Sequence, residues 1–178
     1  MTVEVIPLQK LVRGLIRRVE KARGKSFDFL NFDDRLMVQK ITYLLVKAGI
    51  IRGLSFNYYL RGPYCPELLK LLKDTAENRD LAAREFTEMR NTEIELDPKS
   101  EKRFQQVLDL LKKKNWDVNW LEWFTSGLFF AELELDPRKP NWKKIQELLA
   151  FKKGLKKEVA VQIVDEIKKY VGSGLFTL

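Results

Sequence analysis

Apolar residues recur every three or four positions over much of the chain, which predicts amphipathic helices. Between these stripes lie glycines, prolines and capping residues, the usual punctuation of short loops. The stripes span residues 8–22, 37–48, 66–75, 104–111, 120–133, 142–151 and 160–171. The pattern therefore predicts a mostly helical protein.

Residues that favour helix ends define the boundaries of these predicted helices. Side chains that accept hydrogen bonds from free N–H groups favour the first turn, and glycine favours the position after the last turn. The predicted N-terminal caps are Asp33 or Asp34, Ser100, Asn119 and Asn141, with Glu122 completing a capping box after Asn119. The predicted stops are Gly24, Gly49, Gly154 and Gly172.

Two segments carry the features of strands. Leu54–Leu60 is rich in aromatic residues, and we expect Gly62-Pro63 to break it and lead into a helix that begins near Pro66. Thr92–Leu96 alternates apolar and acidic residues, as a half-exposed strand does, and a hairpin turn could lie at residues 89–92. The predicted fold is thus mainly α with a small antiparallel β-sheet, an α+β class, in one compact domain over residues 1–178. A hairpin at residues 86–96 would resemble the wing of a winged helix.

The net charge of +8 is concentrated at the two ends of the chain. Residues 1–30 carry seven cations and three anions, residues 31–137 carry sixteen and eighteen, and residues 138–178 carry ten and four. Basic ends attract nucleic acid or acidic proteins, although charged helix faces also serve solubility alone. The candidate contacts for a nucleic acid or an acidic partner are Arg13, Arg17, Arg18, Lys152, Lys153, Lys156 and Lys157.

The sequence offers little for catalysis. It has no histidine, which excludes Ser-His-Asp and Cys-His nucleophile systems and the commonest metal ligand. Glu93, Glu95 and Asp97 could share a strand face and hold a cation, but alternation with apolar residues favours a solvated outer face. We expect no enzyme activity, no cofactor and no metal.

Cellular location is predicted from cysteine use and hydropathy. Cys65 is the one cysteine, so no internal disulfide can form, which suits a reducing cytoplasm. Although Cys65 precedes a predicted helix N-terminus, no histidine can serve it as a base, and a structural role is favoured. The longest apolar-rich run is too short to span a bilayer, so we expect no membrane association.

Two motifs resemble a known family. The helix RLMVQKITYLLVKAGI (Arg35–Ile50) followed by FNYYLRGPYCPELLKLL (Phe56–Leu72) resembles the Panacea domain and the related YwgA-like bacterial and archaeal proteins. WLEWFTSGLFF (Trp120–Phe130) is similar to a later helix of that group. The resemblance is most specific at Gln39-Lys40, Tyr43 and Gly62-Pro63-Tyr64, and Cys65 stands where the pattern usually has serine. It implies a Panacea-like core at residues 31–137, between a basic helix at residues 1–30 and a basic helix pair at residues 138–178.

What this resemblance implies for function is protein binding. Panacea domains act as antitoxins that neutralise toxin partners, and a relative is an adaptor for proteolysis. The segment Phe56–Leu68 is then either a tight corner or a docking surface centred on Tyr59, Arg61 and Tyr64, because Tyr and Arg are favoured interface anchors. The leading hypothesis is a non-catalytic protein-interaction module, antitoxin- or adaptor-like, for an acidic partner protein. The alternative is a winged-helix-like nucleic-acid-binding regulator, and homo-oligomerisation stays open.

Overall fold

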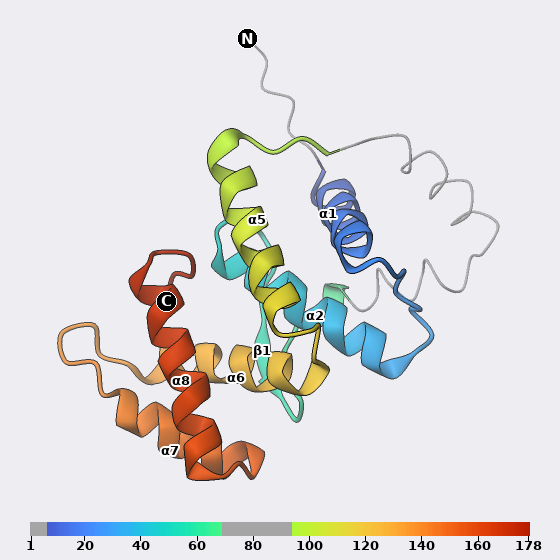
Figure 1. Cartoon of the computed structure of the whole chain (residues 1–178). Helices are drawn as coiled ribbons and strands as arrows, with labels where there is room; N and C mark the ends of the chain where they lie inside the picture. The colour runs from blue at the N-terminus through green and yellow to red at the C-terminus, as the bar shows by residue number, and fades with distance from the viewer. Residues whose placement is uncertain (1–6, 69–93) are drawn as a thin grey trace.

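The computed structural model describes residues 7–68 and 94–178 (Figure 1). It confirms a mainly helical fold with a small two-stranded antiparallel sheet. The helices are α1 (Leu8–Arg23), α2 (Phe32–Lys47), α5 (Pro98–Lys113), α6 (Val118–Glu134), α7 (Trp142–Lys153) and α8 (Lys157–Gly172). The strands are β1 (Asn57–Tyr59) and β2 (Gly62–Tyr64).

Helix α6 forms the centre of the fold. It packs against α2, α7, α8 and strand β2, and nearly every residue from Trp120 to Ala131 is buried. A helix that is apolar on all sides is stable only inside a protein. Gly127 permits the close approach of its neighbours, since a Cβ there would lie 2.7 Å from Ile167 Cδ1 on α8 and 3.4 Å from Leu149 Cδ2 on α7. The run WLEWFTSGLFF is therefore the core helix of the molecule.

Helices α1 and α5 pack beside α2 on the side away from α7 (Figure 1). The apolar stripe of α1 is buried as its spacing predicts, and Gly24 ends the helix in the left-handed conformation with φ of 76°. The chain end closes the core, because Phe176 is buried and Thr177 N–H donates to the Lys47 carbonyl over 2.9 Å. The predicted stops at Gly49, Gly154 and Gly172 are also confirmed within one residue.

Three of the four predicted N-terminal caps are wrong, and each helix begins earlier than expected. Asn31, Asp97 and Asp117 cap α2, α5 and α6, in place of Asp33 or Asp34, Ser100 and Asn119. The carboxylate of Asp97 accepts from Ser100 N–H, and that of Asp117 accepts from both Asn119 and Trp120 N–H. The apolar stripe starts one turn inside each helix, which places the cap before the residues that the stripe suggests. Only Asn141 is confirmed as a cap.

One of the two predicted strands is confirmed in part, because β1 lies within Leu54–Leu60, whereas its partner β2 was not expected. Ile94–Leu96 is not part of a strand, although Ile94 is buried and Glu95 exposed as the alternation predicts. Of the three acidic residues considered as a cation site, Asp97 is a helix cap, Glu95 is exposed, and Glu93 lies outside the described residues. The predicted turn at residues 89–92 and most of the wing-like hairpin also lie outside them.

No helix in the described parts of the chain has the length and hydropathy needed to cross a membrane.

Candidate functional site

Strands β1 and β2 form a tight hairpin in the segment predicted to be a strand-to-helix corner. Tyr59 pairs with Gly62, Tyr58 with Pro63 and Asn57 with Tyr64, which leaves Leu60 and Arg61 as a two-residue loop. The prediction that Gly62-Pro63 ends the strand is therefore wrong, because these residues begin β2. Antiparallel pairs alternate between hydrogen-bonded and non-hydrogen-bonded. Pro63 occupies a non-hydrogen-bonded pair, where its missing N–H leaves the ladder intact.

The hairpin is fixed to α2 by two buried side chains. Gln39 exchanges two hydrogen bonds with the backbone of Cys65, from Nε2 to the carbonyl and from the amide N–H to Oε1, each of 2.9 Å. Lys40 Nζ donates to the Pro63 carbonyl over 2.6 Å. We call Gln39, Lys40, Pro63 and Cys65 the hairpin seat. Several of the residues on which the family resemblance is most specific therefore have a structural role in this chain.

Gly62 is required at the hairpin for two reasons. Its φ of 94° lies in the region that residues with a Cβ rarely adopt. A Cβ at this position would lie 2.6 Å from Ser126 Oγ on α6 and 3.2 Å from Lys40 Nζ. The backbone of β2 thus passes directly against two buried side chains, and any larger residue would displace the hairpin.

A buried carboxylate joins the hairpin to α6 and α7. Glu122 Oε2 accepts from Arg61 Nε over 2.7 Å, and Glu122 Oε1 accepts from Lys153 Nζ over 2.9 Å. Lys153 Nζ also donates to the Leu60 carbonyl in the hairpin loop over 3.2 Å. The side chains of Glu122 and Lys153 are only 8% and 5% exposed, whereas that of Arg61 is 41% exposed. Lys153 therefore does not belong to the exposed cations, and its predicted role as a contact for nucleic acid or an acidic partner does not fit its burial.

Lys40 lies beside this carboxylate. Burial lowers the pKa of Lys40 to about 7; the Glu122 carboxylate opposes this shift, while the positive charges of Lys153 and Arg61 add to it. Burial dominates because a low-dielectric surrounding disfavours the charged form of an amine. The lysine is thus close to the balance between its charged and uncharged forms at neutral pH.

The hairpin presents a group of exposed apolar and aromatic side chains. Leu60 at the tip is 90% exposed and Tyr59 is 50% exposed, with the Tyr59 ring 4.9 Å from that of Tyr64. The Arg61 guanidinium lies 5.8 Å from the ring of Phe32, which begins α2 and is 54% exposed. We call Phe32, Tyr59, Leu60, Arg61 and Tyr64 the hairpin surface. All three residues predicted as protein-binding anchors belong to it.

The inner face of the hairpin is used for packing. The ring of Tyr58 lies 4.9 Å from Phe130 and 5.8 Å from Phe129, both on α6. Tyr43 of α2 is buried against Phe56 and Phe129, and its hydroxyl reaches Glu132 at 3.5 Å. Burial followed by the nearby Glu132 carboxylate raises the pKa of Tyr43. Alternate residues of β1 thus face the core and the solvent.

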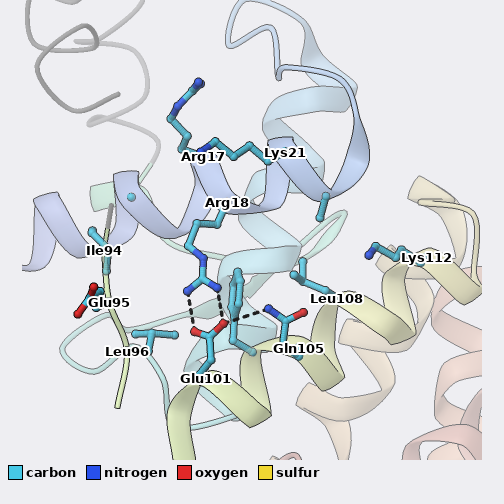
Figure 2. A pocket seen from close by; sticks show the side chains of 13 residues that line it. Arg17, Arg18, Lys21, Ile94, Glu95, Leu96, Glu101, Gln105, Leu108 and Lys112 are labelled. Carbon is cyan, nitrogen blue, oxygen red and sulfur yellow. Dashed lines mark hydrogen bonds and ion pairs between the residues drawn. The ribbon is translucent and has the colours of Figure 1, made fainter. Parts of the chain in front are cut away.

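The three arginines predicted as contacts on α1 are half-buried. A pocket of about 540 Å³ lies between α1 and α5. Figure 2 shows that Arg18 reaches across this pocket to Glu101, whereas Arg17 points away from that pair. Arg18 Nη1 donates to Glu101 Oε2 over 2.7 Å, and its guanidinium lies 4.6 Å from the centre of the Phe104 ring. The bond from Arg18 lowers the pKa of Glu101 to about 2. Arg13 also lies on α1.

The other predicted cations lie where α7 meets α8. Lys152, Lys156 and Lys157 are exposed, and Phe151 beside them is 83% exposed. Helices α1 and α7 lie at opposite ends of the view in Figure 1. The structure therefore separates the predicted cations into two groups and does not form one continuous basic face from them.

Within residues 7–68 and 94–178, no group of three or more acidic, cysteine or histidine side chains is arranged to hold a metal ion. Sequence reasoning missed Lys40, Glu122 and Ser126 as parts of the site, because an apolar stripe indicates buried positions but not buried polar partners. The one available signal was Gln39-Lys40 within an otherwise apolar run.

Comparison of the chain with known families, curated proteins and solved structures finds no match.

Proposed function

We propose that this protein is a non-catalytic protein-interaction module that binds an acidic partner protein through the hairpin surface. The observation that carries the proposal is the exposure of Leu60 and Tyr59 on a hairpin fixed by buried bonds. Contiguous groups of exposed apolar side chains commonly mark interaction sites, and the hairpin surface is such a group. A rigid loop also loses little conformational entropy when a partner binds.

The chemistry of the hairpin surface suits a protein partner. Tyrosine and arginine supply large contact areas, and an exposed leucine can fill an apolar pocket of the partner. Arg61 retains 41% exposure while it is held by Glu122, so it can contact a second carboxylate at the edge of the interface. The net charge of +8 would steer an acidic partner toward the chain.

An antitoxin- or adaptor-like role in the cytoplasm is the form of this proposal that the family resemblance favours. It rests on the motifs at Gln39-Lys40 and Gly62-Pro63-Tyr64 and on the single cysteine, which is buried and free. Because the hairpin seat explains several of these motif residues structurally, they support a shared fold more strongly than a shared partner. The hairpin surface is consequently the better guide to function.

The test is affinity capture from native cells with three forms of the protein. Leu60→Asp places a charge at the centre of the hairpin surface, and Leu133→Asp is the matched control at another exposed leucine, 65% exposed near the end of α6. We expect a stoichiometric protein partner with the unmodified chain and the control, and its loss with Leu60→Asp. Retention of the same partner by Leu60→Asp would contradict the proposal.

Nucleic-acid binding is a second candidate, which one observation favours. Phe151 is exposed beside Lys152, with Lys156 and Lys157 close in sequence, and single-stranded nucleic acids bind aromatic rings flanked by cations. The winged-helix form of this idea has less support, since Ile94–Leu96 is not a strand. Fluorescence anisotropy with labelled single strands tests it: binding that weakens steeply with salt and is lost in Phe151→Ala supports nucleic acid, and a flat signal at low salt excludes it.

A further inference from the structure

The hairpin seat contains a lysine with too few hydrogen-bond partners for its charged form. Lys40 is 1% exposed, and among the described residues its Nζ donates one hydrogen bond, to the Pro63 carbonyl. An ammonium group has three N–H donors. In a dry site, donors without partners cost considerable free energy, whereas an uncharged amine is satisfied by fewer bonds. The closed hairpin therefore favours the uncharged form of Lys40.

The charged groups that face Lys40 leave it without a counterion of its own. They are Glu122 from α6, Arg61 from the hairpin and Lys153 from α7. Both oxygens of Glu122 are already occupied, one by Arg61 and the other by Lys153. Two cations thus share the one carboxylate before Lys40 is counted, so the attraction of Glu122 for a charge on Lys40 is opposed by both of them.

A buried hydroxyl adds a second feature at the same place. Ser126 is fully buried, and its Oγ has no hydrogen-bond partner among residues 7–68 and 94–178. This oxygen and Lys40 Nζ both lie within 3.2 Å of the position that a Cβ of Gly62 would occupy. The hairpin backbone therefore packs against polar groups whose hydrogen bonds are incomplete. Adding a charge in such a surrounding favours opening of the hairpin.

We propose that Lys40 is a proton-sensitive contact that controls the hairpin: its uncharged form holds β2 on α2, and its protonation favours an open hairpin in which Nζ reaches water. The inference rests on the proposed function only in that the same hairpin carries the hairpin surface. An open hairpin would no longer hold Tyr59, Leu60 and Arg61 in one arrangement. Protonation of Lys40 would then weaken binding at that surface.

The direction of the pH dependence follows from the two states. In the open state Lys40 has the ordinary lysine pKa of 10.5, and in the closed state its pKa is lowered to about 7. Between these values opening takes up a proton, so opening becomes rarer as the pH rises. From pH 7 to pH 9 the open population should fall by roughly 50-fold, as the linkage relation gives for these two pKa values.

Amide hydrogen exchange in the isolated protein tests the proposal without any partner. The Gly62 and Cys65 amides report on the hairpin, since Gly62 pairs with Tyr59 and Cys65 N–H is bonded to Gln39. After correction for the intrinsic rate, we expect their protection to rise by tens of fold from pH 7 to pH 9. In Lys40→Met, which cannot titrate, protection should be constant over this range. Low concentrations of urea should have little effect on the protection of these amides, because local opening exposes little surface.

Two outcomes would overturn the proposal. One is protection that is unchanged between pH 7 and pH 9 in the unmodified protein, or that depends on urea as strongly as the amides of the α8 core do. The other comes from NMR titration of the Lys40 Cε signal, which needs no variant: a midpoint near 10.5 would show that burial does not favour the uncharged form. Failure of the partner test with Leu60→Asp leaves these measurements unaffected, so the two proposals can fail separately.

Discussion

The side-chain amide of Gln39 forms two hydrogen bonds, each of 2.9 Å, with the backbone N–H and carbonyl of Cys65, which lies 26 positions later in the chain. Both groups are buried, so no water competes for these bonds. The pair fixes the end of β2 to the middle of α2 and determines where the following residues, Pro66–Leu68, begin a helical conformation.

Substitution of Gln39 should therefore destabilise the protein strongly. Gln39→Leu keeps the approximate volume but leaves the N–H and the carbonyl of Cys65 without partners, which should lower the free energy of unfolding by about 2–4 kcal/mol. Urea denaturation followed by circular dichroism measures this. The control Gln106→Leu lies on the exposed face of α5 and should change stability by no more than about 0.5 kcal/mol. Equal effects of the two substitutions would contradict the role of Gln39.

Gly62→Ala tests the close contact between β2 and α6. The variant adds a Cβ 2.6 Å from Ser126 Oγ, and we expect a loss of about 2–4 kcal/mol from steric overlap and backbone strain together. Gly174→Ala is the matched control, because Gly174 also has a positive φ, of 81°, but among the described residues other than its chain neighbours no atom lies within 4 Å of its added Cβ. It should lose only about 1 kcal/mol from the backbone term.

Ser126→Ala should partly rescue Gly62→Ala, since it removes the oxygen that the new methyl group meets. By itself Ser126→Ala should be nearly neutral, because its Oγ has no hydrogen-bond partner in the described part of the chain. A double-mutant cycle by thermal or urea unfolding gives the coupling between the two positions. Strict additivity of the two substitutions would show that the contact does not limit this site.

Glu122→Gln should be among the most damaging single changes of a charged residue. It leaves the buried Lys153 and the half-exposed Arg61 without their carboxylate, and removal of one partner of a buried pair costs about 3–5 kcal/mol. Glu134→Gln breaks the exposed pair with Lys144 and should cost less than about 1 kcal/mol. Chemical denaturation of both variants at pH 7 compares them directly. Similar losses would indicate that the Glu122 network is not a structural centre.

Global stability should rise between pH 7 and pH 9. The folded-state pKa of Lys40 is lowered to about 7 from 10.5, so in this range the unfolded chain binds more protons and each added pH unit favours folding. The gain should be about 2 kcal/mol over the two units. Above pH 10 the raised pKa of Tyr43 acts in the opposite direction, because the folded state retains a proton that the unfolded state releases. The measurement is the free energy of unfolding as a function of pH. Its rise from pH 7 to pH 9 should be absent in Lys40→Met.

The sequence predicted the helices well because their apolar stripes are long and regular. Val12, Leu15 and Val19 on α1 are buried as their spacing indicates, and Asn141 caps α7 as expected. The hairpin could not be predicted in this way. Pro63 reads as a strand breaker, and its compatibility with β2 depends on a pairing register that only the three-dimensional structure supplies.

The candidate site was predicted in part. Tyr59, Arg61 and Tyr64 do lie together on the hairpin, because turn-flanking residues in one short segment remain neighbours after folding. The internal pairing of Lys153 with Glu122 was not predicted, since a cation at the end of an amphipathic helix normally faces solvent. Lys40 was missed because its acceptor, the Pro63 carbonyl, lies 23 positions away along the chain.

The most direct measurement of the central claim is site-specific photo-crosslinking in the native cell, with a photoreactive amino acid in place of Leu60 and, separately, in place of Leu133. The account predicts one dominant crosslinked protein from position 60, absent from position 133, with an acidic surface at the crosslinked residue. Crosslinks of equal pattern from both positions, or crosslinks from position 60 to nucleic acid only, would contradict it.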